Sequence, residues 1–226
     1  PKPHYLIRDS KTSLAEIKVL NVFISQNNFF NKESIRINEV FIKEANFFLL
    51  SNDLKALYKN SKNKFSKKKI KINNSNIFFK DNLNEVISII KISKAFLFFK
   101  EKNLFNLFHL NGEAFNIPFK LNYQNTFNSQ KKIEIRAPDL KLKITNEIFE
   151  KNEDLMNGMN NISILNSSIN TNYSIKDQIV IFKSDASKTM NSKIDYNGQL
   201  TINPFDLDLK INLYNYKIPI LFRSNS

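Results

Sequence analysis

Apolar and polar residues alternate along most of this chain, and this is the pattern of β-strands with one apolar face and one wet face. The alternation recurs from residue 4 to residue 222, and the sequence shows no regular series of crossover helices between the strands, which argues against a βαβ arrangement. The sequence therefore predicts a mainly β fold: an elongated, curved antiparallel sheet with a groove-like shape, degenerate repeats and one short helix. The predicted helix is Leu54–Asn60, capped by Ser51-Asn-Asp53.

Local irregularities in the alternation predict where strands bend or end. The segment 34–43 changes phase near Asn38-Glu39, which indicates a bulge. Residues 80–82 read as a turn, and the polar segment 147–161, which contains Asn157-Gly158, reads as a loop. A lysine-rich stretch at 61–69 is predicted to be a loop or linker.

Two short motifs occur twice, in the same order. Gly112-x5-Pro118-Phe119 is echoed by Gly198-x5-Pro204-Phe205, and the segment 72–77 is echoed by 164–169, with Ile, Asn, Ser and Ile in register. The echoes predict a β-rich unit used twice in a stacked architecture. The predicted division is 1–69 for N-terminal strands, helix and loop, 70–161 for the first repeat unit and 162–226 for the second, unless all three form one continuous domain.

The amino-acid composition excludes several kinds of functional site. The chain has 226 residues, 42% of them hydrophobic, with 3 glycines and no cysteine. So few glycines predict turns built from Asn, Asp and Ser, with little room for tight type I′ hairpins or phosphate-binding loops. The lack of cysteine excludes disulfides, thiolate nucleophiles and zinc–cysteine sites.

The net charge of +13 has two interpretations. It indicates either an anionic partner, such as nucleic acid or a membrane surface, or the Lys- and Asn-rich coding bias of an AT-rich genome. Lysines are dispersed along the chain and arginines are few, so coding bias is favoured and nucleic acid is disfavoured as a partner.

Catalytic constellations are absent from the sequence. His109 lies in an apolar strand with no neighbouring base, and Asp206-x-Asp208 shares its strand face with Lys210, which favours a solvated charged face. We therefore expect no enzyme activity, no catalytic residue, no cofactor and no metal site. Phenylalanine pairs such as Phe47-Phe48 and Phe98-Phe99 predict one ring on each face of the sheet.

The repeated motifs resemble those of the AsmA-like proteins of Gram-negative bacteria, over segments 72–119 and 164–205. The resemblance implies a curved β groove in the periplasm, anchored to the inner membrane by a helix that this chain does not contain. It also implies that the groove shields lipid acyl chains during inner-to-outer membrane lipid transport and outer-membrane assembly, without catalysis. The chain opens at Pro1 without a methionine, so we expect a soluble segment of a longer protein.

The apolar rows supply candidate groove residues, because a groove wall needs one uncovered apolar strand face. The lipid-groove candidates are Phe115, Ile117, Phe119, Leu121, Phe205, Leu207, Leu209, Ile211 and Leu213. The expected partner is a phospholipid or another acyl lipid. Two alternatives stay open: a module that binds nucleic acid or an anionic surface, and a purely structural β spacer.

Overall fold

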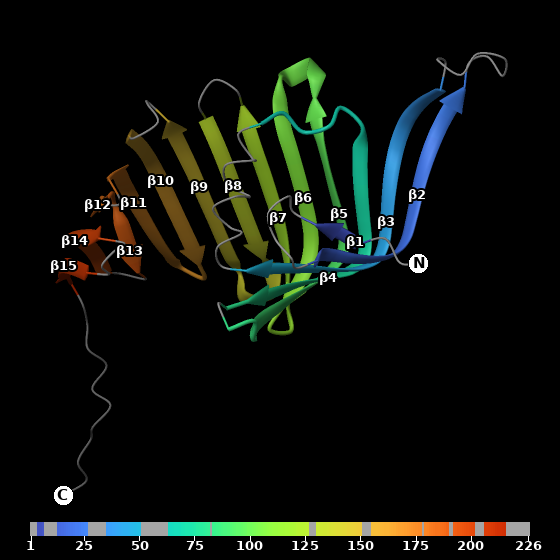
Figure 1. The fold of residues 1–226 in the computed structure, drawn as a ribbon. Coiled ribbons are helices and arrows are strands. Elements are labelled where there is room, and N and C mark those ends of the chain that lie inside the picture. The colour runs from blue at the N-terminus through green and yellow to red at the C-terminus, as the bar shows by residue number, and fades with distance from the viewer. Residues whose placement is uncertain are drawn as a thin grey trace, which may run out of the picture. The chain divides into compact units, whose positions relative to one another are not determined.

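The computed structural model describes residues 4–6, 13–26, 35–50, 63–81, 83–126, 130–150, 155–177, 179–189, 192–201 and 206–215. Contacts divide the chain into two units, Pro1–Asp139 and Leu140–Ser226; the division of the sequence at 69 and 161 stays a prediction. The described residues are almost entirely β-strand, with 3-10 turns at Glu101–Asn103 and Pro138–Leu140 (Figure 1). The predicted mainly β class, with curved and mostly antiparallel strands, is confirmed. The predicted helix lies outside the described residues.

The first unit is a single layer of strands that lie side by side in chain order. Its strands are β1 (His4–Leu6), β2 (Ser13–Gln26), β3 (Ile35–Leu50), β4 (Lys69–Lys80), β5 (Val86–Lys100), β6 (Phe105–Ala114), β7 (Ile117–Thr126) and β8 (Gln130–Ala137). Neighbours pair antiparallel except β3 and β4, which pair parallel. A parallel pair needs a connection that returns along the sheet, and residues 63–68 form the described end of that connection.

The long strands β2 to β5 bend along a line that crosses them (Figure 1). The bend follows one level of the sheet, at which Lys18, Glu44, Asn74 and Ser93 all drop out of the regular pairing. Glu44 and Asn74 have positive φ angles of 54° and 46°, so both strands kink at neighbouring points. Irregularities of this kind raise the local twist and curvature of a sheet.

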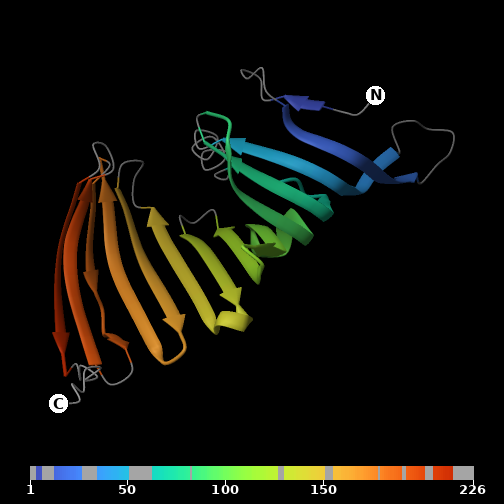
Figure 2. The same ribbon diagram turned by 90° about the horizontal axis from the view of Figure 1, so that it is seen from below.

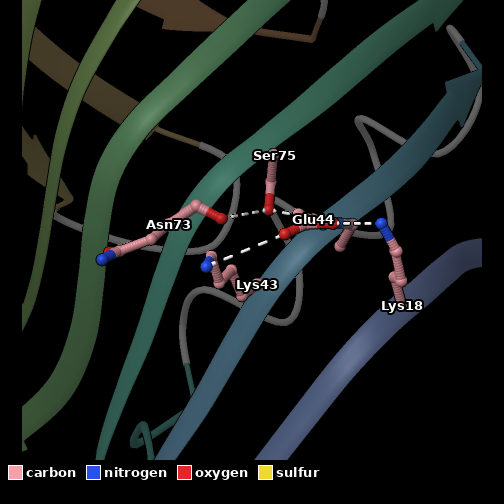
Figure 3. A network of polar contacts seen from close by, with 6 residues as sticks. Lys18, Lys43, Glu44, Asn73 and Ser75 are labelled. Atoms are coloured by element: carbon pink, nitrogen blue, oxygen red, sulfur yellow. Dashed lines mark hydrogen bonds and ion pairs between the residues drawn. The ribbon is translucent and has the colours of Figure 1, made fainter.

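A buried hydroxyl holds the bend together (Figure 3). The Ser75 side chain accepts a hydrogen bond from the Ala45 N–H at 3.0 Å and donates one to the Asn73 carbonyl at 2.9 Å. These bonds replace the ladder bonds that the kink removes, as buried backbone groups require. On the solvent side, the Glu44 carboxylate contacts Lys18 at 2.5 Å and Lys43 at 3.8 Å.

Two of the local irregularities occur as predicted. Phe23 pairs with Glu39 and Ile24 with Ile37, so Asn38 is the extra residue of a bulge in β3. After β4, the Asp81 carboxylate accepts hydrogen bonds from the N–H groups of Leu83 and Glu85, at 2.9 and 2.8 Å, which closes the turn between β4 and β5.

The described core belongs to the first unit and contains two small clusters, with Phe99 and Ala137 buried apart from them. Ala15, Ile17 and Ala45 form one, and Ile92, Ala95 and Leu110 form the other, with partly buried neighbours around each. Both clusters flank the bend line, so curvature buries these side chains although the sheet is one layer thick.

The second unit is also a single layer of antiparallel strands (Figure 2). It contains β9 (Leu142–Glu150), β10 (Leu155–Ile164), β11 (Ser167–Lys176), β12 (Ile179–Ser184), β13 (Ser187–Thr189), β14 (Ser192–Thr201) and β15 (Asp206–Tyr214). The order is β9-β10-β11-β12-β14, β13 pairs with β11 and β14, and β15 pairs with β14.

Two predictions about turns were wrong. Asn157-Gly158 lies within β10 and not in a loop, because Gly158 faces Tyr173 of β11 and the tyrosine ring fills the space of a side chain. A tight hairpin turn without glycine joins β6 to β7: Phe115 and Asn116 have φ angles of 51° and 62°. Both signs match the I′ geometry that glycine usually provides.

The two sequence echoes take different local structures. Gly112 pairs with Phe119 across the β6–β7 hairpin, whereas Gly198 pairs with Leu209 of β15. The segment 72–77 lies inside β4, and its counterpart 164–169 spans the turn between β10 and β11. The repeated sequence motifs therefore do not occupy structurally equivalent positions in the two units.

Candidate functional site: the apolar faces of the two units

Apolar residues of the first unit line up in rows across one face of the sheet, because strand pairing places them side by side. Three rows form this face, which we call the first apolar face. They are Val40–Ile70–Leu97–Phe108–Tyr123–Ile133, Ile42–Ile72–Ala95–Leu110–Leu121–Ile135 and Phe47–Ile77–Ile90–Ala114–Ile117.

Most of the first apolar face is only partly buried. Ala95 and Leu110 are buried at its centre, whereas Ile72, Leu97 and Leu121 keep intermediate exposure. Within the described part of this unit, no second sheet or helix lies over the face. Monomeric proteins rarely expose a continuous apolar surface of this kind, and where one occurs it usually marks a binding site.

One end of the first apolar face is closed by a polar row and a strap of chain. The row Phe99–Asn106–Asn125–Lys131 is almost fully buried, with exposures of 0 to 5%. The Asn106 amide accepts a hydrogen bond from the Phe65 N–H at 2.8 Å and donates one to the Asn63 carbonyl at 2.7 Å. The Phe99 N–H also donates to the Ser66 carbonyl at 2.8 Å. The strap, residues 63–66, is thus fastened across this end.

The opposite face of the first unit, which we call the polar face, mixes charged side chains with phenylalanines such as Phe48, Phe78 and Phe96, and several of its charges are paired. Lys71 contacts Glu39 at 2.5 Å, Lys91 contacts Glu113 at 2.6 Å, and Arg136 contacts Glu134 at 2.8 Å. The hydrogen bond and the charge of Glu134 raise the pKa of Arg136. These contacts reduce the positive potential that a phosphate backbone needs.

The described phenylalanine pairs place one ring on each face, as predicted. Phe47 packs against the core clusters, whereas Phe48 on the polar face stacks on Phe78 at 5.5 Å. The Lys80 ammonium lies 4.9 Å from the Phe48 ring centre. Rings already covered by neighbours and lysines are poor platforms for stacking bases.

The second unit has an apolar face of its own, which we call the second apolar face. One row runs Ile148–Gly158–Tyr173–Phe182–Gly198–Leu209, and another runs Met156–Ile175–Val180–Leu200–Leu207. A methyl group on Gly158 would overlap the Tyr173 ring, and one on Gly198 would lie 2.7 Å from the Phe182 ring. Aromatic rings therefore cover the glycines of both strands, a known way to stabilise glycine in a sheet.

A hollow of about 610 Å³ lies over the other face of the second unit. Its lining includes the row Gly158–Tyr173–Phe182–Gly198 and the residues next to that row, such as Met159, Asn172 and Lys183. Alternation places those neighbours on the face opposite to the rings. The row thus supplies a backbone floor, and Phe149 and Ile181 supply the apolar walls.

Eight of the nine predicted groove residues lie in described segments, and seven of these eight lie on one of the two apolar faces. Ile117 and Leu121 lie on the first apolar face, and Phe119 lies on the same side and packs against the second core cluster. Leu207, Leu209, Ile211 and Leu213 lie on the second apolar face with exposures of 43 to 54%.

Phe115 does not belong with the others. It lies in the β6–β7 turn and is 79% exposed, so its assignment to the apolar strand face was wrong; the strand parity ends where the turn begins. Phe205 lies outside the described residues.

The histidine and the acidic pair occupy ordinary positions. His109 Nδ1 lies 2.6 Å from the Asn122 side-chain oxygen, and its ring stacks on Phe96 at 5.0 Å. Asp206 and Asp208 are exposed on β15. Among the described residues, no group of His, Asp and Glu side chains could hold a metal ion, and no helix is long and apolar enough to cross a membrane.

Comparison with known proteins finds no matching family model, no matching curated protein and no matching solved structure.

Sequence reasoning missed much of the first apolar face. Ile42, Ile72 and Ile90 were not selected, because the parity of β3, β4 and β5 changes at Glu44, Asn74 and Ser93. In the sequence, the Asn-rich segment around Asn74 has the composition of a turn. The apolar segments on either side of it, 70–72 and 77–79, therefore resemble two separate short strands. A one-residue shift of the alternation at Asn74 is the signal that joins them into one strand.

Proposed function

We propose that the first unit shields the acyl chain of a lipid on its apolar face. The observation that carries the proposal is the set of continuous, half-exposed apolar rows from β3 to β8 on a single-layer sheet. Each methylene moved from water onto such a surface gains about 0.8 kcal/mol at full burial. A chain of ten or so methylenes therefore binds without a polar anchor.

The closed end of the first apolar face determines how a bound acyl chain is oriented. The buried polar row at Asn106 and the strap 63–66 block the β5–β6 turn end of the face. A straight acyl chain enters from the other end, near the β6–β7 turn, and its methyl terminus stops before Asn106. Its polar head stays near Phe115 and the exposed residues of that turn.

The resemblance to AsmA-like proteins supports a wider proposal. We propose that the chain is a non-enzymatic segment of a periplasmic protein, anchored to the inner membrane in its full-length form, that takes part in lipid transport to the outer membrane. The one-sided apolar rows agree with that role, since a lipid conduit needs a wall and no reacting groups.

Lipid binding is tested directly on the purified protein. Native mass spectrometry and solvent extraction after expression in a Gram-negative host should reveal co-purified phospholipid or fatty acid, and a fluorescent polyene fatty acid should bind to delipidated protein. Leu121→Glu puts a charge on the first apolar face and should lower that affinity at least ~10-fold.

Gln124→Glu provides the matched control, because Gln124 is exposed on β7 and faces the polar side. Ala114→Trp gives a second, uncharged test: it fills the row at Ile90 and Ile117 and should also reduce binding. Equal affinity of wild type, Leu121→Glu and Ala114→Trp would contradict the proposal. An absence of any bound lipid would favour the structural spacer.

The nucleic-acid alternative makes an opposite prediction about salt. Affinity for an oligonucleotide would fall steeply with added salt, whereas binding of an acyl chain changes little. The paired charges and covered rings of the polar face favour the second result. Flat fluorescence anisotropy of a labelled oligonucleotide at low salt would remove this alternative.

A further inference from the structure

Among the described strands of the second unit, β15 is the last, and one of its edges has no described partner. It pairs with β14 on one side only, and no described strand lies on its other side. All nine residues are exposed, and the described strand contains no proline and no bulge. Such an edge presents unpaired N–H and C=O groups and pairs readily with another strand.

The side chains of β15 carry charges that face no opposite charge on the described part of the second unit. Across β14, Asp208 faces Gln199 and Lys210 faces Asn197. None of the ion pairs among the described residues involves Asp208 or Lys210. On β14 the same i, i+2 spacing does produce a pair, Lys193–Asp195 at 2.8 Å.

These residues complement a second copy of the same strand. When β15 lies antiparallel to its two-fold mate with Leu209 opposite Leu209, each Asp208 stands opposite Lys210 of the other copy. Leu207 then faces Ile211, and Asp206 faces Asn212. Apolar side chains meet on one face and two opposite-charge pairs meet on the other, both of which stabilise a sheet. A register centred on Lys210 would instead oppose the two ammonium groups.

We propose that two copies of this chain associate through β15, antiparallel and centred on Leu209. An isologous two-fold contact of this kind closes on itself and needs no further copies. The row of the second apolar face that ends at Leu207 continues in Ile211 of the other copy, so the dimer has a longer apolar surface than either protomer.

Charge exchange tests the register. Wild-type protein, followed by light scattering during gel filtration over a concentration series, should reach twice the 26.5 kDa monomer mass. Asp208→Lys and Lys210→Asp each replace two attractive pairs with two repulsive ones and should weaken dimerisation about tenfold. The double variant exchanges the charges and should restore it.

Asp206→Lys is the matched control, because Asp206 faces neutral Asn212 in this register and should change dimerisation far less. All three substitutions are at exposed positions, and circular dichroism checks that each of the four variants remains folded.

Single cysteines give a second, independent readout, since the natural chain has none. Leu209→Cys places two thiols opposite each other, with Cβ atoms about 4.5–5.5 Å apart, and should form an intermolecular disulfide rapidly. Ile211→Cys faces Leu207 and should cross-link slowly alone but readily when mixed with Leu207→Cys.

Three results would overturn the proposal. One is a monomer at all accessible concentrations, and another is equal cross-linking at positions 209 and 211. The third is hydrogen-exchange protection of β15 in the monomer, which would show that another part of the same chain covers the edge.

Discussion

The two units share one architecture but bury their side chains differently. In the first, strands of up to 16 residues bend, and curvature buries alanines, isoleucines and a leucine around the bend line. In the described part of the second, strands have at most 10 residues, and the buried residues outside glycine are Ser187 and Ser192. The first single-layer sheet thus obtains a core where its long strands bend, whereas the described part of the second depends on polar and aromatic contacts.

Side-chain hydrogen bonds occupy the centre of the second unit. The Ser187 hydroxyl accepts from the Asn170 N–H at 2.8 Å and donates to the Asn170 carbonyl at 2.9 Å. Thr171 and Tyr196 share a hydrogen bond of 2.5 Å, and Asn161 donates to Asn170. These contacts define the pairing but contribute less than apolar burial does, so we expect the second unit to be the less stable one.

Truncation of a core side chain should give the largest difference in lost stability between the two units. Leu110→Ala removes a side chain that is 3% exposed and should lower the free energy of unfolding by about 2–4 kcal/mol. Ile162→Ala, on a half-exposed row between Ile144 and Ile169, should cost about 1 kcal/mol. Hydrogen exchange followed by mass spectrometry measures each unit by its own peptides. Equal losses of unfolding free energy in the two variants would contradict the view that, in the described parts of the chain, only the first unit has an apolar core.

Substitution of Gly158 and Gly198, the two strand glycines of the second unit, should have the next largest effect. Gly198→Ala forces a methyl group onto the Asp208 carbonyl and the Phe182 ring, and we expect a loss of about 1–3 kcal/mol. Gly158→Ala meets the Tyr173 ring alone, so Tyr173→Leu should rescue Gly158→Ala. Phe182→Leu should not rescue Gly198→Ala, because the backbone carbonyl stays. Thermal unfolding of the four variants measures both pairs.

Removal of a buried serine hydroxyl should destabilise the two units by similar amounts. Ser75→Ala and Ser187→Ala each remove a buried hydroxyl with two hydrogen bonds, and each should cost about 1–3 kcal/mol. Ser93→Ala is the control, since that hydroxyl is exposed and makes one bond, to the Asn111 carbonyl. Urea unfolding should show similar losses for the first two variants; a much smaller loss for Ser75→Ala would mean that packing alone holds the bend.

The ion pair at the bend should matter least. The hydrogen bond and charge of Lys18 lower the pKa of Glu44, so the pair stabilises the fold above the usual Glu pKa and loses this effect as pH falls through the lowered value. Lys18→Met should raise the Glu44 pKa in an NMR titration and flatten the acid side of the stability curve slightly. A large loss of stability at neutral pH would contradict its exposed position.

Local patterns explain why the sequence predicted the strands but not their pairing. The phase slip at Asn38 and the turn at Asp81 depend on neighbouring residues, so alternation was enough to find them. The parallel pairing of β3 with β4 depends on a connection that local patterns do not describe. Gly158 suggested a turn for the same reason: the ring that compensates for its missing side chain belongs to another strand.

The candidate site was predicted only in part, also for physical reasons. Leu121 and Leu209 follow regular alternation and were found on apolar faces. Ile72 was missed because a positive φ at Asn74 shifts the parity within β4. The closing contact of Asn106 with the strap joins residues 41 and 43 positions apart, which no strand pattern reveals.

Photo-crosslinking of a fatty acid tests the central proposal most directly. A palmitate analogue with a diazirine at its terminal carbon is bound to delipidated protein, irradiated and mapped by mass spectrometry. Our account predicts labels on the first apolar face, concentrated on peptides that contain Ile72, Leu97 or Leu121, and their loss in Leu121→Glu but not in Gln124→Glu. Labels spread over the polar face, or unchanged in Leu121→Glu, would contradict it.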